Sequence, residues 1–296
     1  MISEIGNKRV YIYVLRYESE LDRGILLTKI AETARTFDDL GAVVVFGKID
    51  IELIVESVGL GIYTFPKISN DVLKIRQVSL YAPQHQLTST DLAPVIRKIE
   101  SVWLARDLVN LPPNYKNPEQ LETIVRSLPW QNTRVVSLQK AELIEQSFGL
   151  LLAVGAGSDI PPRVLVLERI GETRPTETAL VGKGVTFDAG GLQIKPDTGM
   201  LDMKLDMAGA AAVVASFWYA DVIKNIPVSA VGSIGLVENL LGGSAFKPLD
   251  VLTSHSGKTV EVHHTDAEGR LVLGDLVSHI AQRSAPKNIV TFATLT

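Results

Sequence analysis

The sequence of 296 residues contains no cysteine. Disulfide bonds and thiolate metal sites are therefore excluded, and the absence suits a reducing compartment. The opening stretch MISEIGNKRVYIYVLRYESE lacks the basic flank and apolar core of a secretory signal. The chain also lacks a run of about 18 apolar residues, the length that a membrane span needs. From these absences we expect a cytoplasmic protein that does not enter a membrane.

Positive charge is too scarce for a broad nucleic-acid surface. Lys and Arg total 29 against 33 Asp and Glu, which gives a formal net charge of −4. Phosphate binding needs clustered Lys and Arg, so we expect no nucleic-acid partner. Hydrophobic residues make up 46% of the chain, which is typical of a soluble globular protein with a sizeable core.

Strand-like and helix-like patterns alternate along the chain, which predicts an α/β fold. In the first part, residues 21–37 have the apolar spacing of a helix. The apolar, β-branched runs predicted to be strands there are 9–15, 42–47, 51–58 and 75–82. After the polar stretch PQHQLTSTD, a helix is predicted to begin at Thr90 or Asp91 and to end before the prolines of LPPN. We therefore expect a small α/β domain over 1–88, a linking helix over 89–112 and a larger domain over 113–296.

The larger domain is predicted to contain a mixed, mostly parallel sheet. Its expected strands are 133–138, 149–155, 163–170, 178–187, 228–237 and 288–295. Its expected helices are 118–127, 207–220 and 270–282. Because strands of such a sheet are buried on both faces, helices should cover both sides of it.

Three short segments place charged residues among apolar ones. VGKGVTFDAGGLQIK holds two lysines and an aspartate, MLDMKLDMAGAAAV places Asp206 before a small-residue helix, and HHTDAEGR carries Asp266 and Glu268. Burying these charges costs several kcal/mol per ion unless each is paired or binds a metal. On extended backbone Asp266 and Glu268 would point the same way, so with Asp188 and Asp206 they can surround two divalent cations. Oxygen ligands suit magnesium, manganese or zinc alike.

Each segment also has an ordinary structural interpretation. An Asp before a helix is commonly a cap, and a glycine-rich run is commonly a turn. GKGVTF is not a phosphate loop, because no Ser or Thr follows its lysine at the required position. The pair His263–His264 lacks the i, i+4 spacing of helical metal ligands and is interpreted as structural. Only the three segments together favour a metal site.

The blocks VGKGVTFDAGGLQIKP, MKLDMAGAAAV and HTDAEGRLVL resemble the signature blocks of the leucine (cytosol) aminopeptidase family. ARDLVNLPPN, FKPLDVLTSHSGKTVEV and the terminal ATLT are similar to weaker blocks, so the resemblance covers about 105–296. It implies a metalloaminopeptidase that removes leucine-like residues from the free amino terminus of peptides. The hydroxide would be activated by two metal ions, zinc, manganese or both. The resemblance further implies a homo-oligomer, a hexamer in the family, and a catalytic domain that continues past ATLT.

The resemblance also implies roles for individual residues. The family's metal-ligand positions carry Lys183, Asp188, Asp206, Asp266 and Glu268, and its catalytic positions carry Lys195 and Arg270. Lys183 would ligate as the neutral amine, a form that burial and a nearby dication favour. Lys195 would stay protonated and donate to the developing oxyanion. Arg270 would bind bicarbonate, the family's proposed proton shuttle. His264 and Ala189 stand where the family usually has Asn and Ser, and neither is a ligand position.

One geometric constraint follows from spacing. Lys183 and Asp188 are five residues apart, so on a regular strand their side chains would face opposite sides of the sheet. The strand is therefore predicted to bulge or end between them, with Gly182 and Gly184 as the expected place.

Two other functions compete with the metalloaminopeptidase. One is a family member without peptidase activity that serves as a structural or binding subunit. The other is a two-metal phosphoesterase, against which the lysine block argues. Because the family continues beyond ATLT, we expect the 296-residue chain alone to bind metal weakly and to cleave peptides poorly or not at all.

Overall fold

The computed structural model describes residues 2–5, 8–11, 28–32, 34, 40–44, 50–65, 77–81, 89–170, 172–223 and 228–295. The chain divides into two compact units, Met1–Trp103 and Leu104–Thr296. The dividing point lies within helix α3 (Ser89–Asn110), which begins and ends close to the predicted positions. All three charged segments belong to the second unit.

The first unit contains two small sheets and helix α2 (Ile51–Gly61). β1 (Ile2–Ile5) pairs antiparallel with β2 (Lys8–Tyr11), and β3 (Leu40–Val44) pairs in parallel with β4 (Gln77–Tyr81). The described parts of the predicted strands at 9–15, 42–47 and 75–82 are thus extended, and 28–32 within the predicted helix is helical. Of those predictions, residues 12–15, 21–27, 33, 35–37, 45–47, 75–76 and 82 lie outside the described residues.

The predicted strand at 51–58 is wrong, because this stretch forms most of α2. Ile51, Ile54 and Val58 are buried and recur at helical spacing. Asp50 caps the helix, since its carboxylate accepts hydrogen bonds from the amides of Glu52 and Leu53. The cap and the apolar face together outweigh the strand preference of the β-branched residues.

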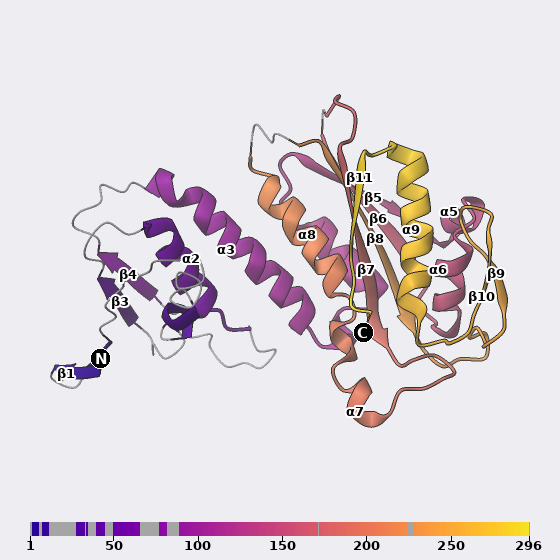
Figure 1. Ribbon diagram of the computed structural model, residues 1–296, viewed down its shortest axis with the longest axis horizontal. Helices are drawn as coiled ribbons and strands as arrows, with labels where there is room; N and C mark the ends of the chain where they lie inside the picture. Colours follow the sequence, from indigo (N-terminus) through magenta and orange to yellow (C-terminus); the bar gives the residue numbers. More distant parts are fainter. Residues whose placement is uncertain are drawn as a thin grey trace. The chain divides into compact units, whose positions relative to one another are not determined.

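A five-stranded sheet forms the centre of the second unit (Figure 1). Its order is β11 (Asn288–Phe292), β7 (Thr178–Asp188), β8 (Ala230–Asn239), β6 (Arg163–Arg169), β5 (Thr133–Leu138). β11 and β8 both pair in parallel with β7, whereas β6 is antiparallel to both of its neighbours. Four strands therefore run in one direction and β6 opposes them, which confirms the mixed, mostly parallel sheet.

Helices cover both faces of this sheet, as Figure 1 shows. α4 (Pro118–Ser127) and α8 (Ala208–Ala220) pack on one face, and α6 (Gly149–Val154) and α9 (Glu268–Ser284) pack on the other. Strand β6 shows why residues 164–167 are all apolar. Leu165 and Leu167 enter the core under α4 and α8, while Val164 and Val166 enter the core under α6 and α9. Among the helices that the structure describes, none is both long and apolar enough to cross a membrane.

Short elements complete the second unit. They are η1 (Pro113–Tyr115), α5 (Lys140–Glu145), η2 (Gly155–Gly157), α7 (Asp197–Met200), η3 (Met203–Leu205), and the antiparallel pair β9 (Val251–Thr253) and β10 (Thr259–Glu261).

The predicted strand at 149–155 is also wrong, because Gly149–Val154 is helix α6. The buried carboxylate of Asp275 in α9 accepts hydrogen bonds from the first amides of this helix, those of Leu150 and Leu151, at 2.9 and 3.0 Å. The helix is therefore capped by a residue that is distant in the sequence, and no local pattern shows this.

The predicted bulge in β7 exists, but not at the glycines. The pairing of β7 with β8 shifts register between Val185 and Phe187, which leaves Thr186 as the extra residue. Gly182 has a different role, because a Cβ atom there would lie 2.8 Å from the Cα of Ala210 in α8. The glycine permits close helix packing, and the bulge turns the end of the strand.

Candidate metal centre

The charged residues meet where the parallel strands end. Asp188 is the last residue of β7, and Thr294 follows β11. Asp206 lies just before α8, and Glu268 is the first residue of α9. Glu268 therefore does not lie on the extended backbone that the sequence predicted for it. Loops and helix starts at the carboxyl ends of parallel strands are the usual place for a binding site in this architecture.

Three buried carboxylates form the centre of the cluster. Asp188, Asp206 and Glu268 each offer an oxygen within 4.8 Å of the others. They are only 2%, 4% and 1% exposed. Burial raises the pKa of Glu268 to about 7 and also raises the pKa of Asp206. In both cases Lys183 opposes the shift and the charge of Asp188 adds to it.

Lys183 lies among these acids. Its Nζ is 2.8 Å from Asp206 Oδ2 and 2.7 Å from Glu268 Oε1. It also donates a hydrogen bond to the carbonyl oxygen of Thr294 at 2.7 Å. Gly269 makes room for the lysine, because a Cβ atom there would be 2.7 Å from Lys183 Nζ. The lysine is thus held in place by strand, helix and loop together.

Lys195 connects the buried carboxylates to Asp266. Its Nζ is 2.9 Å from Asp188 Oδ2 and also forms an ion pair with Asp266 Oδ1. Burial alone would lower the pKa of Lys195, but hydrogen bonds with Asp266 and Asp188 outweigh it and raise that pKa above its usual value. Lys195 is therefore an ammonium group, and both it and Asp266 are partly open to solvent.

The remaining predicted residues lie at the rim. Arg270 is exposed on the first turn of α9 and, within the described residues, makes no hydrogen bond or ion pair with the cluster. His263 is exposed and pairs with Glu261 at 3.2 Å. His264 accepts a hydrogen bond from the amide of Asp266 at 3.1 Å. The structure therefore brings together six of the seven predicted side chains, and neither histidine reaches into the centre.

Sequence reasoning missed three polar residues that hold the cluster. Asn239 Nδ2 donates to Asp188 Oδ1 at 2.8 Å, and Thr294 Oγ1 donates to Asp206 Oδ1 at 2.6 Å. Thr265 accepts a hydrogen bond from Asn239 through its carbonyl oxygen. The sequence could have indicated Asn239 and Thr294, because each is a polar residue at or just after the carboxyl end of an apolar strand beside β7.

The donor set fits a divalent cation. Asp206 Oδ2 and Glu268 Oε1 are buried and close to Lys183, yet neither accepts a well-aligned hydrogen bond. Buried carboxylate oxygens that cluster in this way are the ligands that hard dications bind. The residues present therefore suit the metal that the sequence resemblance implies.

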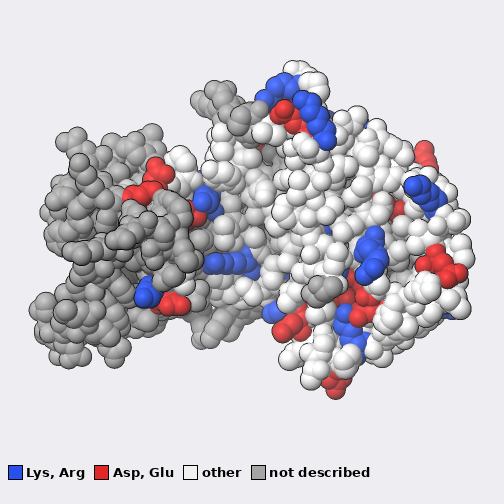
Figure 2. All heavy atoms as spheres, viewed as in Figure 1, with Lys and Arg blue, Asp and Glu red and all other residues white. Residues whose placement is uncertain are grey.

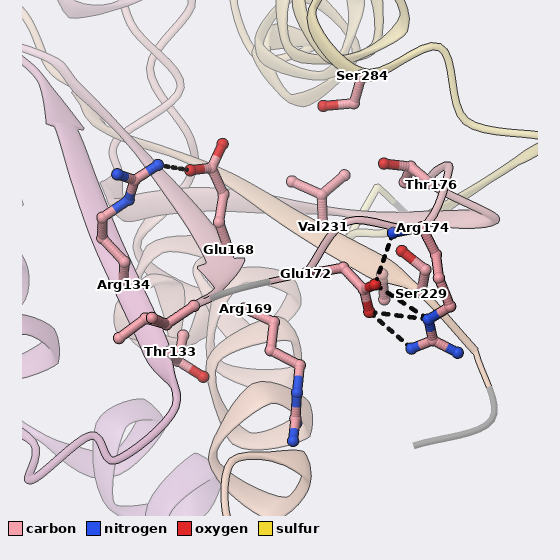
Figure 3. A pocket seen from close by; sticks show the side chains of 12 residues that line it. Thr133, Arg134, Glu168, Arg169, Glu172, Arg174, Thr176, Ser229, Val231 and Ser284 are labelled. Atoms are coloured by element: carbon pink, nitrogen blue, oxygen red, sulfur yellow. Dashed lines mark hydrogen bonds and ion pairs between the residues drawn. The ribbon is translucent and has the colours of Figure 1, made fainter. Parts of the chain in front are cut away.

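A cavity of about 710 Å³ lies elsewhere, where β7 and β8 begin (Figure 3). Four of its five charged residues form pairs, Arg134 with Glu168 at 2.6 Å and Arg174 with Glu172 at 2.6 Å. The fifth, Arg169, donates to the carbonyl oxygens of Ala220 and Ile223. No residue of the three motifs lines it. On the face drawn in Figure 2, acidic and basic groups of the described residues are likewise interspersed. The carboxylate and lysine cluster is therefore the better candidate site.

The fold and the cluster define an α/β protein with a charged centre at the carboxyl ends of its parallel strands. The sequence model of the cytosol aminopeptidase family, catalytic domain, matches residues 103–296. The chain belongs to this family.

Relatives agree with this assignment. A probable cytosol aminopeptidase of Methylobacterium radiotolerans is 46% identical over 198 residues, which are 67% of this chain and 39% of the relative. One of Nitrobacter winogradskyi is 40% identical over 234 residues, 79% of this chain and 47% of the relative. The chain thus spans less than half the length of these curated relatives.

Solved structures are similar as well. The leucine aminopeptidase of Caenorhabditis elegans superposes with a TM-score of 0.78 at 30% identity, covering 91% of this chain and 56% of that one. The bottromycin maturation enzyme BotP, solved in complex with Mn, gives a TM-score of 0.77 at 30% identity, covering 91% of this chain and 61% of that one.

Proposed function

We propose that this chain carries the metal centre and the catalytic lysine of a metal-dependent aminopeptidase. One observation carries the proposal: three buried carboxylates and two lysines converge at the strand ends of a chain from this family. The manganese complex of BotP, a structural neighbour, supports the choice of a divalent cation. The proposed substrates are peptides with a free amino terminus and a leucine-like first residue.

Five residues are proposed to hold two divalent ions, either zinc or manganese: Lys183, Asp188, Asp206, Asp266 and Glu268. When bound, the ions would lower the pKa of a water molecule and polarise the peptide carbonyl. Lys183 would bind as the free amine, so its proton must leave when the site fills. Asp188 and Glu268 are the most buried of the acids, and by the family resemblance both ions would share them.

Lys195 is proposed to stabilise the developing oxyanion. It is an ammonium group at the partly open edge of the cluster, where a substrate carbonyl oxygen can accept its hydrogen bond. Arg270 offers a planar guanidinium at the same rim, and we propose that it binds bicarbonate as a proton shuttle. No side chain of the described cluster other than the proposed ligands is an evident general base, which agrees with that role.

Several wider properties are proposals too. We propose a cytoplasmic protein that assembles as a homo-oligomer, a hexamer by family resemblance. We also propose the domain boundaries predicted above: 1–88, 89–112 and 113–296. Light scattering at micromolar concentration tests the assembly, since a mass of 32.2 kDa would show a monomer.

The decisive experiment is a paired measurement of metal binding and peptide hydrolysis. The chain is titrated with Mn²⁺, and turnover of leucine p-nitroanilide is followed with and without the metal. Metal-dependent hydrolysis supports the proposal. Binding without hydrolysis supports the metal centre but not the peptidase activity; it agrees both with the poor cleavage expected of this chain alone and with the alternative function, a structural or binding subunit. A chain that binds neither Mn²⁺ nor Zn²⁺ has no such metal centre.

A further inference from the structure

Thr265 is a fully buried threonine whose polar groups all have partners. Its Oγ1 donates to the carbonyl oxygen of Gly190 at 2.6 Å and accepts from the amide of Gln193 at 3.0 Å. Its own amide donates to Gln193 Oε1 at 2.8 Å, and its carbonyl oxygen accepts from Asn239 Nδ2 at 3.1 Å. The threonine itself touches no proposed ligand side chain in these bonds.

These bonds join three segments that carry the proposed site. Gly190 and Gln193 belong to the loop between Asp188 and Lys195. Asn239 ends β8, and the same amide group that contacts Thr265 also donates to Asp188 Oδ1 at 2.8 Å. Thr265 itself directly precedes Asp266. The threonine is therefore the point at which the Lys195 loop, the end of β8 and the Asp266 segment meet.

The loop needs such an attachment. Gly190 and Gly191 have φ values of +89° and +68°, so the loop contains two residues with wide backbone freedom. Within the loop, the amide of Lys195 donates to the carbonyl of Ala189 at 3.0 Å. Among the described residues, the Ala189 amide also donates to the carbonyl oxygen of Asn239 at 2.9 Å, and further bonds of the loop run through Asp188, Gln193 and Thr265.

We propose that the Thr265 hydroxyl is a positioning group that sets the distance between Lys195 and the carboxylates of Asp188 and Asp266. This inference rests on the proposed function, because it assigns a role toward the same metal centre. The hydroxyl acts through the loop backbone. Without it, the carbonyl of Gly190 and the amide of Gln193 lose a buried partner, and the loop relaxes away from the Asp266 segment. Partners that orient metal ligands commonly change metal affinity about 10- to 100-fold when they are removed.

Thr265→Val tests this, because valine keeps the shape and the backbone groups and removes only the hydroxyl. Thr265→Ser is the rescue variant, since it keeps the hydroxyl and removes the methyl group. Thr133→Val is the matched control, a buried threonine in β5 at the opposite edge of the sheet. Two quantities are measured on the full chain: Mn²⁺ affinity, from the electron paramagnetic resonance signal of the free ion, and amide hydrogen exchange of residues 190–195 without metal.

We expect Thr265→Val to weaken Mn²⁺ binding about 10-fold or more and to speed exchange in the loop about 10-fold. Thr265→Ser and Thr133→Val should stay within about 3-fold of the parent chain in both measurements. Equal losses in the valine and serine variants would overturn the inference, because retaining the hydroxyl would then preserve neither the metal affinity nor the protection of the loop. Unchanged exchange in Thr265→Val would also overturn it, whether or not metal binds. If the parent chain binds no Mn²⁺ but the exchange results hold, the proposed function fails while the positioning of the loop stands.

Discussion

Replacing Lys183 by methionine removes the positive charge from the centre of the cluster while nearly preserving the volume. The lysine lies 2.8 Å from Asp206 and 2.7 Å from Glu268, and all three side chains are almost completely buried. Removing one partner of a buried ion pair costs about 3–5 kcal/mol, because the remaining charge has no compensation. We therefore expect Lys183→Met to lower the free energy of unfolding of the metal-free chain by about 3 kcal/mol at pH 8.

The loss should depend on pH with a definite sign. The pKa of Glu268 is raised from 4.5 to about 7 in the folded chain, so the folded state holds this proton over a range where the unfolded state releases it. The contribution of Glu268 to the free energy of unfolding is therefore fully present below pH 4.5 and is lost as the pH rises through about 7. Without Lys183 the acid should hold its proton still more tightly. The penalty of Lys183→Met should thus be smaller at pH 6 than at pH 8, by at most about 1.4 kcal/mol per pH unit.

Urea denaturation of the metal-free protein, followed by circular dichroism at pH 6 and pH 8, measures both effects. Lys247→Met is the control, since Lys247 is exposed and its pair with Asp250 spans 3.5 Å. This surface pair should contribute less than about 1 kcal/mol at either pH. Equal urea midpoints for Lys183→Met and the parent chain at pH 8 would refute the reasoning, because the buried ammonium would then not stabilise the acids.

Three further predictions follow from the site and its surroundings. Lys195→Ala should abolish any turnover and leave the content of bound metal, measured by elemental analysis, nearly unchanged. Asp266→Ala should lose metal. Equal metal loss in both variants would show that the two roles are wrongly assigned. Mn²⁺ at about 100 times its Kd should raise the free energy of unfolding by about 2.7 kcal/mol in the parent chain, and by clearly less in Asp266→Ala. Burial lowers the pKa of His279 to about 4, and among the described residues its Nδ1 has no hydrogen-bond partner. Stability should therefore be lost as the pH falls from 6.5 toward 4, by about 2.5 kcal/mol at pH 4.5, and His279→Gln should reduce this loss in thermal melts. A parent chain and His279→Gln with the same acid dependence would exclude His279 as the cause.

Much of the second unit was predictable from local pattern. Helix α4 occupies Pro118–Ser127 as predicted, because Asn117 and Gln120 form a capping box before an amphipathic run. Strand β5 occupies Thr133–Leu138 as predicted. The motif residues could be identified from the sequence because charged residues among apolar ones are conspicuous. The resemblance to the family rests on the same residues. Their roles in metal binding and catalysis are proposals that the experiments above address.

Local pattern misled where a distant residue supplied the missing contact. The runs 51–58 and 149–155 contain apolar and β-branched residues that suit a strand or a helix equally. Residues 149–154 form helix α6 and not a strand because Asp275 caps the first amides of the helix. Asp275 lies in another helix, more than a hundred positions later in the sequence. In β7, the odd spacing of five residues between Lys183 and Asp188 correctly predicted a bulge. The pairing with β8 places that bulge at Thr186.

By itself, the sequence determined which residue types are available and how far apart they lie along each element, since helix and strand periodicity depend only on neighbours. The tertiary structure alone decided which groups meet. The three partner residues of Thr265 come from two other segments of the chain. Of the acids that pair with Lys183, Asp206 lies just before α8 and Glu268 begins α9. The physical reason is that buried polar groups must all find partners, and this condition is satisfied across the whole fold and not within any short stretch of sequence.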